Sequence, residues 1–137
     1  TEMENTGRVY EDVLADAQRL GYAEADPTMD VGGFDAAHKL TILAAIAFGA
    51  RPDFDHVAIE GVDGVTLTDI RMAGKLGYRI KLIARGELID GAASMRVRPA
   101  LLPLDHPLAN VGGSLNALVV DADPVGQPTD SGADVPN

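Results

Sequence analysis

The sequence predicts an α+β fold in which helices pack on one face of a mixed β-sheet. Two observations lead to this prediction. Helical and strand periodicities follow one another in the order helix, helix, strand, helix, strand, strand, strand. Two of the strand patterns alternate so that one face is polar and exposed to solvent. The chain has 137 residues, of which 46% are apolar and 23% charged, as in an ordinary globular domain. We therefore expect one domain with an aliphatic core.

Two helical patterns occupy the first third of the chain. Residues 9–20 place four apolar side chains on one stripe, and Gly21 follows as a left-handed stop. This pattern predicts an amphipathic helix with one buried face. Residues 36–48 are apolar nearly all round, which predicts a second helix buried between layers.

A short strand and a third helix come next. Residues 56–62 have the composition of a strand. Thr66 and Asp69 then have the spacing of a capping box, in which each side chain satisfies a backbone N–H of the other residue. A helix that begins there should end at Gly77.

Three further strand patterns complete the domain. Residues 78–86 and 94–102 both alternate apolar and polar side chains, so a hairpin or a pair of neighbouring strands is expected. Residues 114–122 are apolar on both faces near their middle, as in an interior or subunit-interface strand. Residues 123–137 have almost no core-forming side chains and should be disordered. We thus expect one domain over residues 1–122, followed by a disordered tail.

The composition excludes several classes of partner and site. Eleven basic and twenty-one acidic residues give a formal net charge of −10, which repels phosphate backbones and anionic membranes, so neither nucleic acid nor membrane is expected as a partner. No cysteine is present, so disulfides, thiolate nucleophiles and thiolate metal ligands are excluded. The longest apolar run, residues 40–50, is too short to span a bilayer, and the acidic N-terminus differs from a signal peptide. We expect a cytoplasmic protein.

The common catalytic and nucleotide-binding motifs are absent. The sequence contains no GxGxxG, GxxxxGK[ST], GxSxG or HExxH, so no nucleotide loop is predicted within it. The three histidines, His38, His56 and His106, lie far apart and lack the spacing of metal ligands. We expect no metal site.

A cluster of charge lies ahead of the second helix and on its first turns. It consists of four carboxylates and one lysine: Glu24, Asp26, Asp30, Asp35 and Lys39. For any single acid, the simpler explanation is the helix dipole or the i, i+4 pair of Asp35 with Lys39, each worth well under ~1 kcal/mol. Together, however, the acids exceed what a helix start needs. Carboxylates that converge bind a substrate ammonium, and a nearby lysine donates or accepts a proton.

The same stretch is similar to a known family. GYAEADPTMDVGGFDAAHKL resembles the substrate-binding segment of homoserine dehydrogenases. The similarity continues through EGVDGVTLTDIRMAGKLGYRIKLIARGE to LLPLDHPLANVGGSLNALVV and covers roughly residues 3–121. It implies a reaction in which aspartate semialdehyde and L-homoserine are interconverted with NAD or NADP.

The resemblance also implies roles for individual residues of the charged cluster. Lys39 matches the lysine that donates a proton to the carbonyl oxygen, and Asp35 matches the aspartate one turn before it. Glu24 matches the glutamate that binds the amino group of homoserine. Tyr22 and Asp30 match further residues that line the substrate pocket.

Members of the resembled family combine a Rossmann domain with a mixed-sheet catalytic and dimerisation region in each subunit. The similarity here is to that second region alone, so the cofactor should be bound mainly by a domain that this sequence does not contain. An alternative function stays open, namely a stand-alone amino-acid-binding or dimerisation module without redox activity. The choice between NAD and NADP also stays open.

A homodimer is expected from the strand pattern at residues 114–122. Leu115, Ala117 and Val119 point to one face, and Leu118 and Val120 point to the other. A single-layer core cannot cover both faces. In the resembled family this region lies at the dimer contact. We therefore expect a two-fold dimer formed through residues around 95–120.

Overall fold

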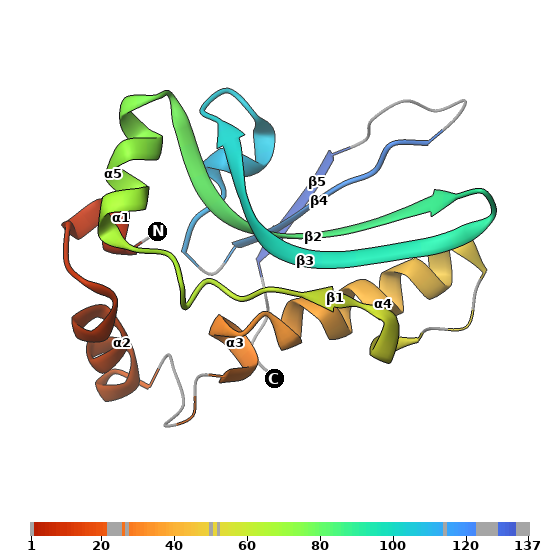
Figure 1. Cartoon of the computed structure of the whole chain (residues 1–137), viewed down its shortest axis with the longest axis horizontal. Helices are drawn as coiled ribbons and strands as arrows, with labels where there is room; N and C mark the ends of the chain where they lie inside the picture. Colours follow the sequence, from red (N-terminus) through yellow and green to blue (C-terminus); the bar gives the residue numbers. More distant parts are fainter. Residues whose placement is uncertain are drawn as a thin grey trace.

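The computed structural model describes residues 2–21, 26, 28–49, 51, 53–113, 115–122 and 129–133 (Figure 1). Its helices are α1 (Glu2–Thr6), α2 (Tyr10–Arg19), α3 (Thr28–Val31), α4 (Phe34–Phe48) and α5 (Leu67–Lys75), with 3-10 turns η1 (Phe54–His56) and η2 (Pro107–Asn110). Its strands are β1 (Ala58–Ile59), β2 (Tyr78–Ile89), β3 (Ala92–Pro103), β4 (Leu115–Val119) and β5 (Thr129–Ala133). The predicted α+β class is confirmed.

A long hairpin of β2 and β3 forms the main sheet. The sheet has the order β1-β3-β2, in which β2 is antiparallel to β3 and β1 is parallel to it. The hairpin closes at Asp90 and Gly91, which both have positive φ values, 51° and 78°. A two-residue turn of this kind matches the right-handed twist of the strands. The predicted hairpin is therefore confirmed, and both of its strands are longer than predicted.

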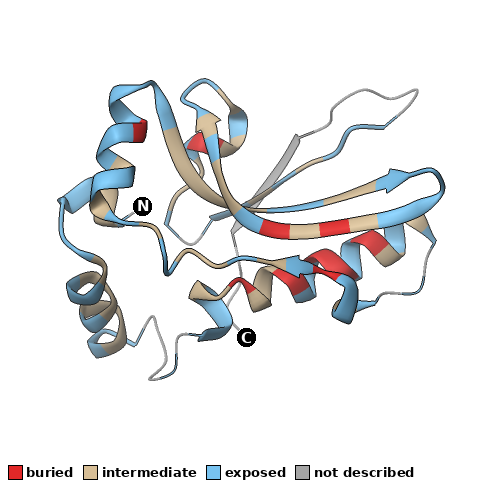
Figure 2. Ribbon diagram, in the orientation of Figure 1, coloured by how far each residue is buried: buried red, intermediate tan, exposed pale blue. Residues whose placement is uncertain are grey.

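Helix α4 packs along one face of this hairpin (Figure 2). The core cluster joins Ala37, Leu40 and Ala44 of the helix to Met95 and Val97 of β3. Ala37, Leu40 and Ala44 are three and four residues apart, so they lie on one side of the helix. They form a narrow apolar stripe that packs on the sheet. This contact supplies the core between the sheet and α4.

Glycine in β2 allows the helix to come close to the sheet. A Cβ atom on Gly86 would lie 3.3 Å from Cδ1 of Leu40 and 3.5 Å from Cε2 of Phe48. A side chain at this position would therefore push α4 outward, which explains a glycine inside an otherwise regular strand.

The prediction that residues 36–48 are buried all round is wrong within the described chain. The stripe of α4 opposite the sheet is bare, with exposed fractions of 60% for Ile42 and 77% for Ile46. Helix α2 likewise has no fully buried residue, and Leu20 just after it is 61% exposed. The apolar patterns correctly predicted the two helices, but apolar composition alone does not specify whether a second layer covers them.

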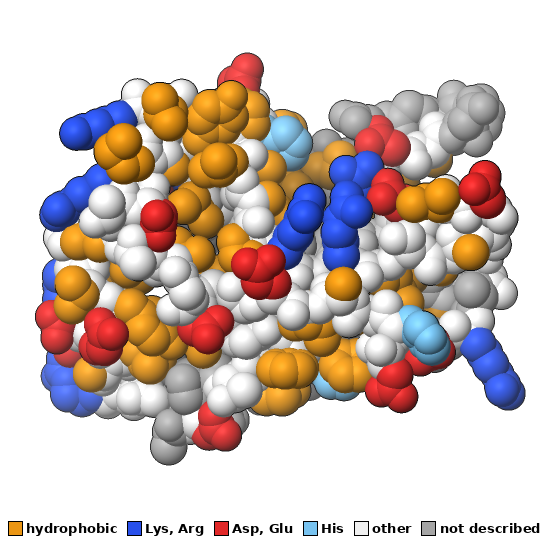
Figure 3. Space-filling model, viewed as in Figure 1, with side chains coloured by type: hydrophobic (Ala, Val, Ile, Leu, Met, Phe, Trp, Pro, Cys, Tyr) orange, Lys and Arg blue, Asp and Glu red, His pale blue; other side chains and the backbone are white. Residues whose placement is uncertain are grey.

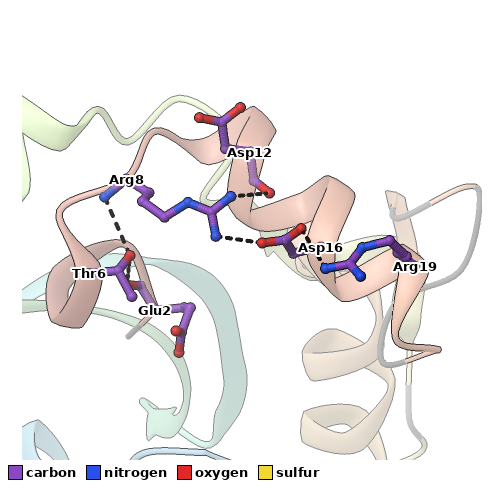
Figure 4. Close-up of polar contacts among 6 residues, drawn as sticks. All are labelled: Glu2, Thr6, Arg8, Asp12, Asp16 and Arg19. Atoms are coloured by element: carbon purple, nitrogen blue, oxygen red, sulfur yellow. Dashed lines mark hydrogen bonds and ion pairs between the residues drawn. The ribbon is translucent and has the colours of Figure 1, made fainter.

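One ion pair joins the link between α1 and α2 to α2 (Figure 4), and another joins α1 to the sheet. Arg8, between the two helices, binds the Asp16 carboxylate at 2.5 Å, and Arg19 binds its other oxygen at 3.1 Å. The hydrogen bonds from Arg8 and Arg19 hold the pKa of Asp16 below its usual value. In α1, Glu4 accepts a hydrogen bond of 2.7 Å from Nε of Arg79 in β2. These contacts orient α2, whose end leads into the segment of Tyr22 and Glu24.

The smaller elements follow the sequence patterns closely. The capping box at α5 is present, because the Thr66 hydroxyl accepts from the Asp69 N–H and the Asp69 carboxylate accepts from the Thr66 N–H. Gly77 has a φ of 82°, as a left-handed stop requires. The strand predicted over residues 56–62 is confirmed but short, because only Ala58 and Ile59 pair with β3.

The C-terminal part of the chain forms a second, two-stranded sheet. Strand β4 pairs antiparallel with β5, and the register joins Leu115 to Ala133 and Val119 to Thr129. Residues 129–133 therefore form a strand within the segment that was expected to be disordered. Residues 123–128 and 134–137 lie outside the described residues, so the boundary at residue 122 stays a prediction. Within the described part of the chain, no helix is long and apolar enough to cross a membrane.

Gly33, where α4 begins, provides a test of this packing. Its φ is 84°, and a Cβ atom there would lie 3.1 Å from Cγ1 of Val97. We expect Gly33→Ala to lower the free energy of unfolding by about 1–3 kcal/mol, because the left-handed backbone and the close contact both oppose a side chain. Urea denaturation followed by circular dichroism measures this change.

The matched control is Gly74→Ala in α5, where nothing lies within 4 Å of the added Cβ atom. This substitution should raise the free energy of unfolding by up to about 1 kcal/mol, because alanine favours a helix over glycine. Similar effects of the two substitutions would contradict the packing described for Gly33.

Candidate functional site

The charged cluster lies where α3 meets α4. The two helices are joined by Gly32 and Gly33, and the loop that follows β1 packs directly on this junction. The Val62 N–H donates to the Val31 carbonyl at 2.8 Å, and the Glu60 N–H donates to the Val97 carbonyl at 2.8 Å. The loop is therefore bound on one side to β3 and on the other to the end of α3, just ahead of the junction with α4.

Close approach of backbone is required at this junction. A Cβ atom on Gly61 would lie 2.4 Å from the Val31 carbonyl oxygen and 2.7 Å from Cα of Gly32. Only glycine fits there without displacing α3. The position of the acids on α3 and α4 is thus fixed by contacts with a loop about thirty residues further along the chain.

Asp35 and Lys39 form the predicted pair on the first turns of α4. Nζ of Lys39 lies 3.4 Å from Oδ2 of Asp35, and the two side chains are 48% and 50% exposed. They share the outward stripe of the helix with Ile42 and Ile46, on the side away from the sheet. An ion pair this exposed contributes little to folding. The pair therefore lies on the side of α4 that faces away from the sheet.

The structure separates Asp26 from the other acids of the cluster. One of its carboxylate oxygens accepts from the Thr28 N–H at 3.1 Å and from the Thr28 hydroxyl at 2.5 Å. These bonds hold the pKa of Asp26 below its usual value. Asp26 therefore has a local structural role at the start of α3.

The structure describes one of the three remaining predicted residues. Asp30 lies exposed on α3, one short turn before the junction with α4. Tyr22 and Glu24 lie outside the described residues. Asp30 therefore lies on the helix that directly precedes α4, and the pocket roles of all three residues stay predictions.

The sequence analysis missed a hollow beside this junction. It has a volume of about 210 Å³ and is lined by Tyr10, Thr28, Val31, Gly32 and Asp63. Burial, with Asp63 and Glu11 nearby, raises the pKa of the Tyr10 phenol. These residues come from α2, α3 and the loop before α5, so no local sequence pattern joined them.

The three histidines have local partners. The His38 ring stacks on Phe54 of η1 with ring centroids 4.0 Å apart. His56 lies 2.6 Å from the Asp53 carboxylate, and Nδ1 of His106 accepts from the Leu108 N–H. In the part of the chain that the structure describes, no group of three His, Asp or Glu side chains could hold a metal ion. The expectation that the protein has no metal site stays a prediction.

Comparison with known proteins gives one consistent result. The family model for homoserine dehydrogenase matches residues 1–135. The homoserine dehydrogenase of Pseudomonas aeruginosa is 52% identical over 126 residues, which are 92% of this chain and 29% of that protein. That of Corynebacterium glutamicum is 49% identical over 130 residues, or 91% of this chain and 29% of that protein.

Solved structures agree with the sequence comparison. A homoserine dehydrogenase from Thiobacillus denitrificans superposes with a TM-score of 0.92 at 49% identity, over 96% of this chain and 31% of that one. A hyperthermophilic archaeal homoserine dehydrogenase, solved in complex with NADPH, gives a TM-score of 0.75 at 27% identity, over 96% of this chain and 36% of that one. This chain therefore spans about a third of the length of the relatives that it matches.

Neighbouring residues of α4 test whether the charged pair serves stability. We expect Lys39→Ala to change the free energy of unfolding by less than about 1 kcal/mol, because the pair is half exposed. Leu40, the next residue, lies on the buried stripe of α4. Leu40→Ala should therefore lower the free energy of unfolding by about 2–5 kcal/mol. Urea denaturation of both variants measures the difference. A loss of several kcal/mol from Lys39→Ala would mean that the lysine is part of the fold.

Proposed function

Because this chain belongs to the homoserine dehydrogenase family, we propose that it forms the catalytic and dimerisation region of an enzyme that interconverts aspartate semialdehyde and L-homoserine. The observation that carries this proposal is the Asp35–Lys39 pair, whose Nζ and Oδ2 atoms are 3.4 Å apart on the outward stripe of α4. A lysine and a carboxylate in this arrangement suit an amino-acid substrate with a carbonyl group. The enzyme would belong to the biosynthesis of threonine and methionine.

We assign proton transfer to Lys39. Reduction of the aldehyde carbonyl produces an alkoxide, and a positioned ammonium group stabilises this oxygen and donates a proton to it. When bound, the nicotinamide cofactor supplies the hydride. In the reverse direction the neutral amine of Lys39 accepts the hydroxyl proton of homoserine. Asp35 holds the ammonium of Lys39 toward the substrate side of α4.

We assign substrate binding to Glu24, with Tyr22 and Asp30 at the same pocket. The amino group of homoserine is an ammonium at neutral pH, so a fixed carboxylate gives both affinity and orientation. Asp30 is compatible with this assignment, because it is exposed on α3, the short helix that directly precedes α4. Orientation of the aldehyde relative to Lys39 follows from anchoring the other end of the molecule.

The cofactor is proposed to be NAD or NADP, held mainly by parts of the relatives that this chain does not span. The sequence has no dinucleotide fingerprint, and the chain covers 29% of the Pseudomonas aeruginosa relative. The NADPH complex of the archaeal relative supports this class of cofactor. The cytoplasm is the proposed location, because a cysteine-free sequence and nicotinamide-dependent biosynthesis both fit a reducing compartment.

We propose a homodimer formed through residues around 95–120, with β4 at its centre. Strands β4 and β5 form a separate sheet of two strands, and such a ribbon is marginally stable without a partner surface. Its apolar side chains are bare, with exposed fractions of 52% for Leu115 and 42% for Leu118. A second copy that covers this ribbon would remove an aggregation hazard.

The catalytic assignment predicts a division of effects between two variants of the full-length enzyme. Lys39→Ala should lower kcat by about 10²–10⁴-fold with little change in substrate affinity, because general acid catalysis contributes an effect of this size. Glu24→Ala should act chiefly on KM. Steady-state kinetics of folded variants measures both constants. If Lys39→Ala kept near-native kcat, the proton donor would be another residue or water.

The proposed homodimer predicts the oligomeric state of two variants of β4. The wild-type chain should sediment as a dimer at tens of micromolar, and Val119→Asp should sediment as a folded monomer, because a charge at an apolar contact prevents burial. The control is Asn116→Asp, which adds the same charge at an already polar and exposed position of the strand. A well-folded wild-type monomer at these concentrations would show that one subunit covers β4 by itself.

A further inference from the structure

Backbone packs directly on backbone where α3 joins α4. Gly32 and Gly33 connect the two helices, and Gly61 of the loop after β1 lies against them. A Cβ atom on Gly61 would lie 2.4 Å from the Val31 carbonyl oxygen and 2.7 Å from Cα of Gly32. Contacts this short leave no room for a side chain.

Space, and not backbone conformation, requires glycine at position 61. The φ of Gly33 is 84°, whereas the φ of Gly61 lies outside the left-handed region, so an alanine could adopt it. The third close atom is Oδ1 of Asp63, at 2.8 Å, and it belongs to an exposed side chain that can turn away. Gly61 is therefore required by the backbone at the end of α3.

The loop that carries Gly61 is anchored on the main sheet. The Glu60 N–H donates to the Val97 carbonyl at 2.8 Å, directly after β1 pairs with β3. On the other side of Gly61, the Val65 N–H donates to the Val62 carbonyl at 3.0 Å and closes a turn. These hydrogen bonds oppose movement of the loop.

Helix α3 is held less firmly than this loop. It has four residues, Thr28–Val31, and none of them is buried. Because an ordinary van der Waals contact needs about 3.5 Å, a Cβ atom at position 61 would push the Val31 carbonyl outward by roughly 1 Å. This displacement should be taken up by α3, which carries Asp30.

Helix α4, in contrast, begins on the core. Gly33 is buried, and a Cβ atom there would lie 3.1 Å from Cγ1 of Val97 and 3.4 Å from Cγ2 of Ile59. Ala37, one turn later, is completely buried. A change at position 61 should therefore move α3 relative to α4 and leave Lys39 in place.

We propose that Gly61 is a positioning residue that sets where Asp30 of α3 lies relative to the Asp35–Lys39 pair of α4. This inference rests on the proposed function, in which Asp30 lines the substrate pocket and Lys39 transfers the proton. Asp30 directly precedes Val31, whose carbonyl Gly61 contacts. A charge-assisted hydrogen bond needs a distance of about 2.7–2.9 Å, so a displaced carboxylate binds an ammonium group less tightly. The loop after β1 thus governs substrate affinity separately from proton transfer.

Steady-state kinetics of the full-length enzyme test this separation. Gly61→Ala should raise KM for L-homoserine by roughly three- to tenfold, the loss expected when one hydrogen bond is weakened. The kcat value should change by less than about twofold, because Lys39 does not move. The matched control is Gly64→Ala in the same loop, where nothing lies within 4 Å of the added Cβ atom. This control should leave both constants unchanged.

A double-mutant cycle distinguishes positioning from a purely structural role. If Gly61 acts through Asp30, adding Gly61→Ala to Asp30→Ala should raise KM no further. Circular dichroism checks that each variant is folded. Equal KM values for Gly61→Ala and Gly64→Ala, or the same rise in KM with and without Asp30, overturn the proposal. Loss of the fold in Gly61→Ala also overturns it, because the glycine would then serve the whole domain.

Amide NMR of the chain tests the displacement without reference to activity. Gly61→Ala should shift the amide resonance of Asp30 and leave that of Lys39 unchanged, and Gly64→Ala should shift neither. A wild-type enzyme that does not turn over homoserine would contradict the proposed function, whereas these shifts would still report the movement of α3. Equal shifts at Asp30 and Lys39, or no shift at Asp30, would show that Gly61 does not position α3 relative to α4.

Discussion

The contact between α4 and the β2–β3 hairpin is the constraint on which the rest of the structure depends. Ala37, Leu40 and Ala44 lie against Met95 and Val97, and Gly86 leaves room for the helix. Burial of these apolar side chains is the main favourable term available to a domain of this size. The contact fixes which stripe of α4 faces the sheet. It therefore also fixes which stripe faces outward.

Two chemically different surfaces follow from this one contact. The outward stripe of α4 carries the Asp35–Lys39 pair, at the end of the helix next to the α3–α4 junction. The reverse face of the hairpin carries the arginines, because strand alternation places Arg96 and Arg98 opposite the buried residues of β3. Proton transfer is thus assigned to one side of the small core, and the other side carries a concentration of positive charge, visible as basic side chains over the β2–β3 ribbon in Figure 3. Each surface can be changed without removing the residues that hold the fold together.

The sequence predicted the parts of the structure that depend on local patterns. The capping box at Thr66 and the alternation in β2 and β3 are local, and both were confirmed. The bare stripe of Ile42 and Ile46 was not predicted, because a helix that is apolar all round has the same sequence whether or not a second layer covers it. The contact of Gly61 with the α3–α4 junction joins segments far apart in the chain, which no periodicity could have placed together.

Binding of L-homoserine to the chain by itself tests the central claim most directly. The account predicts that a titration followed by amide NMR gives weak, saturable shifts centred on Asp30, Asp35 and Lys39, and that the Lys39→Ala chain shows altered shifts at the same place. It also predicts no oxidation of homoserine when NAD or NADP is added to the chain, because nothing in the sequence matches a dinucleotide loop. Saturable shifts confined to β4 and β5, or no shifts up to the solubility limit of homoserine, would contradict the assignment of this helix as the substrate-binding surface.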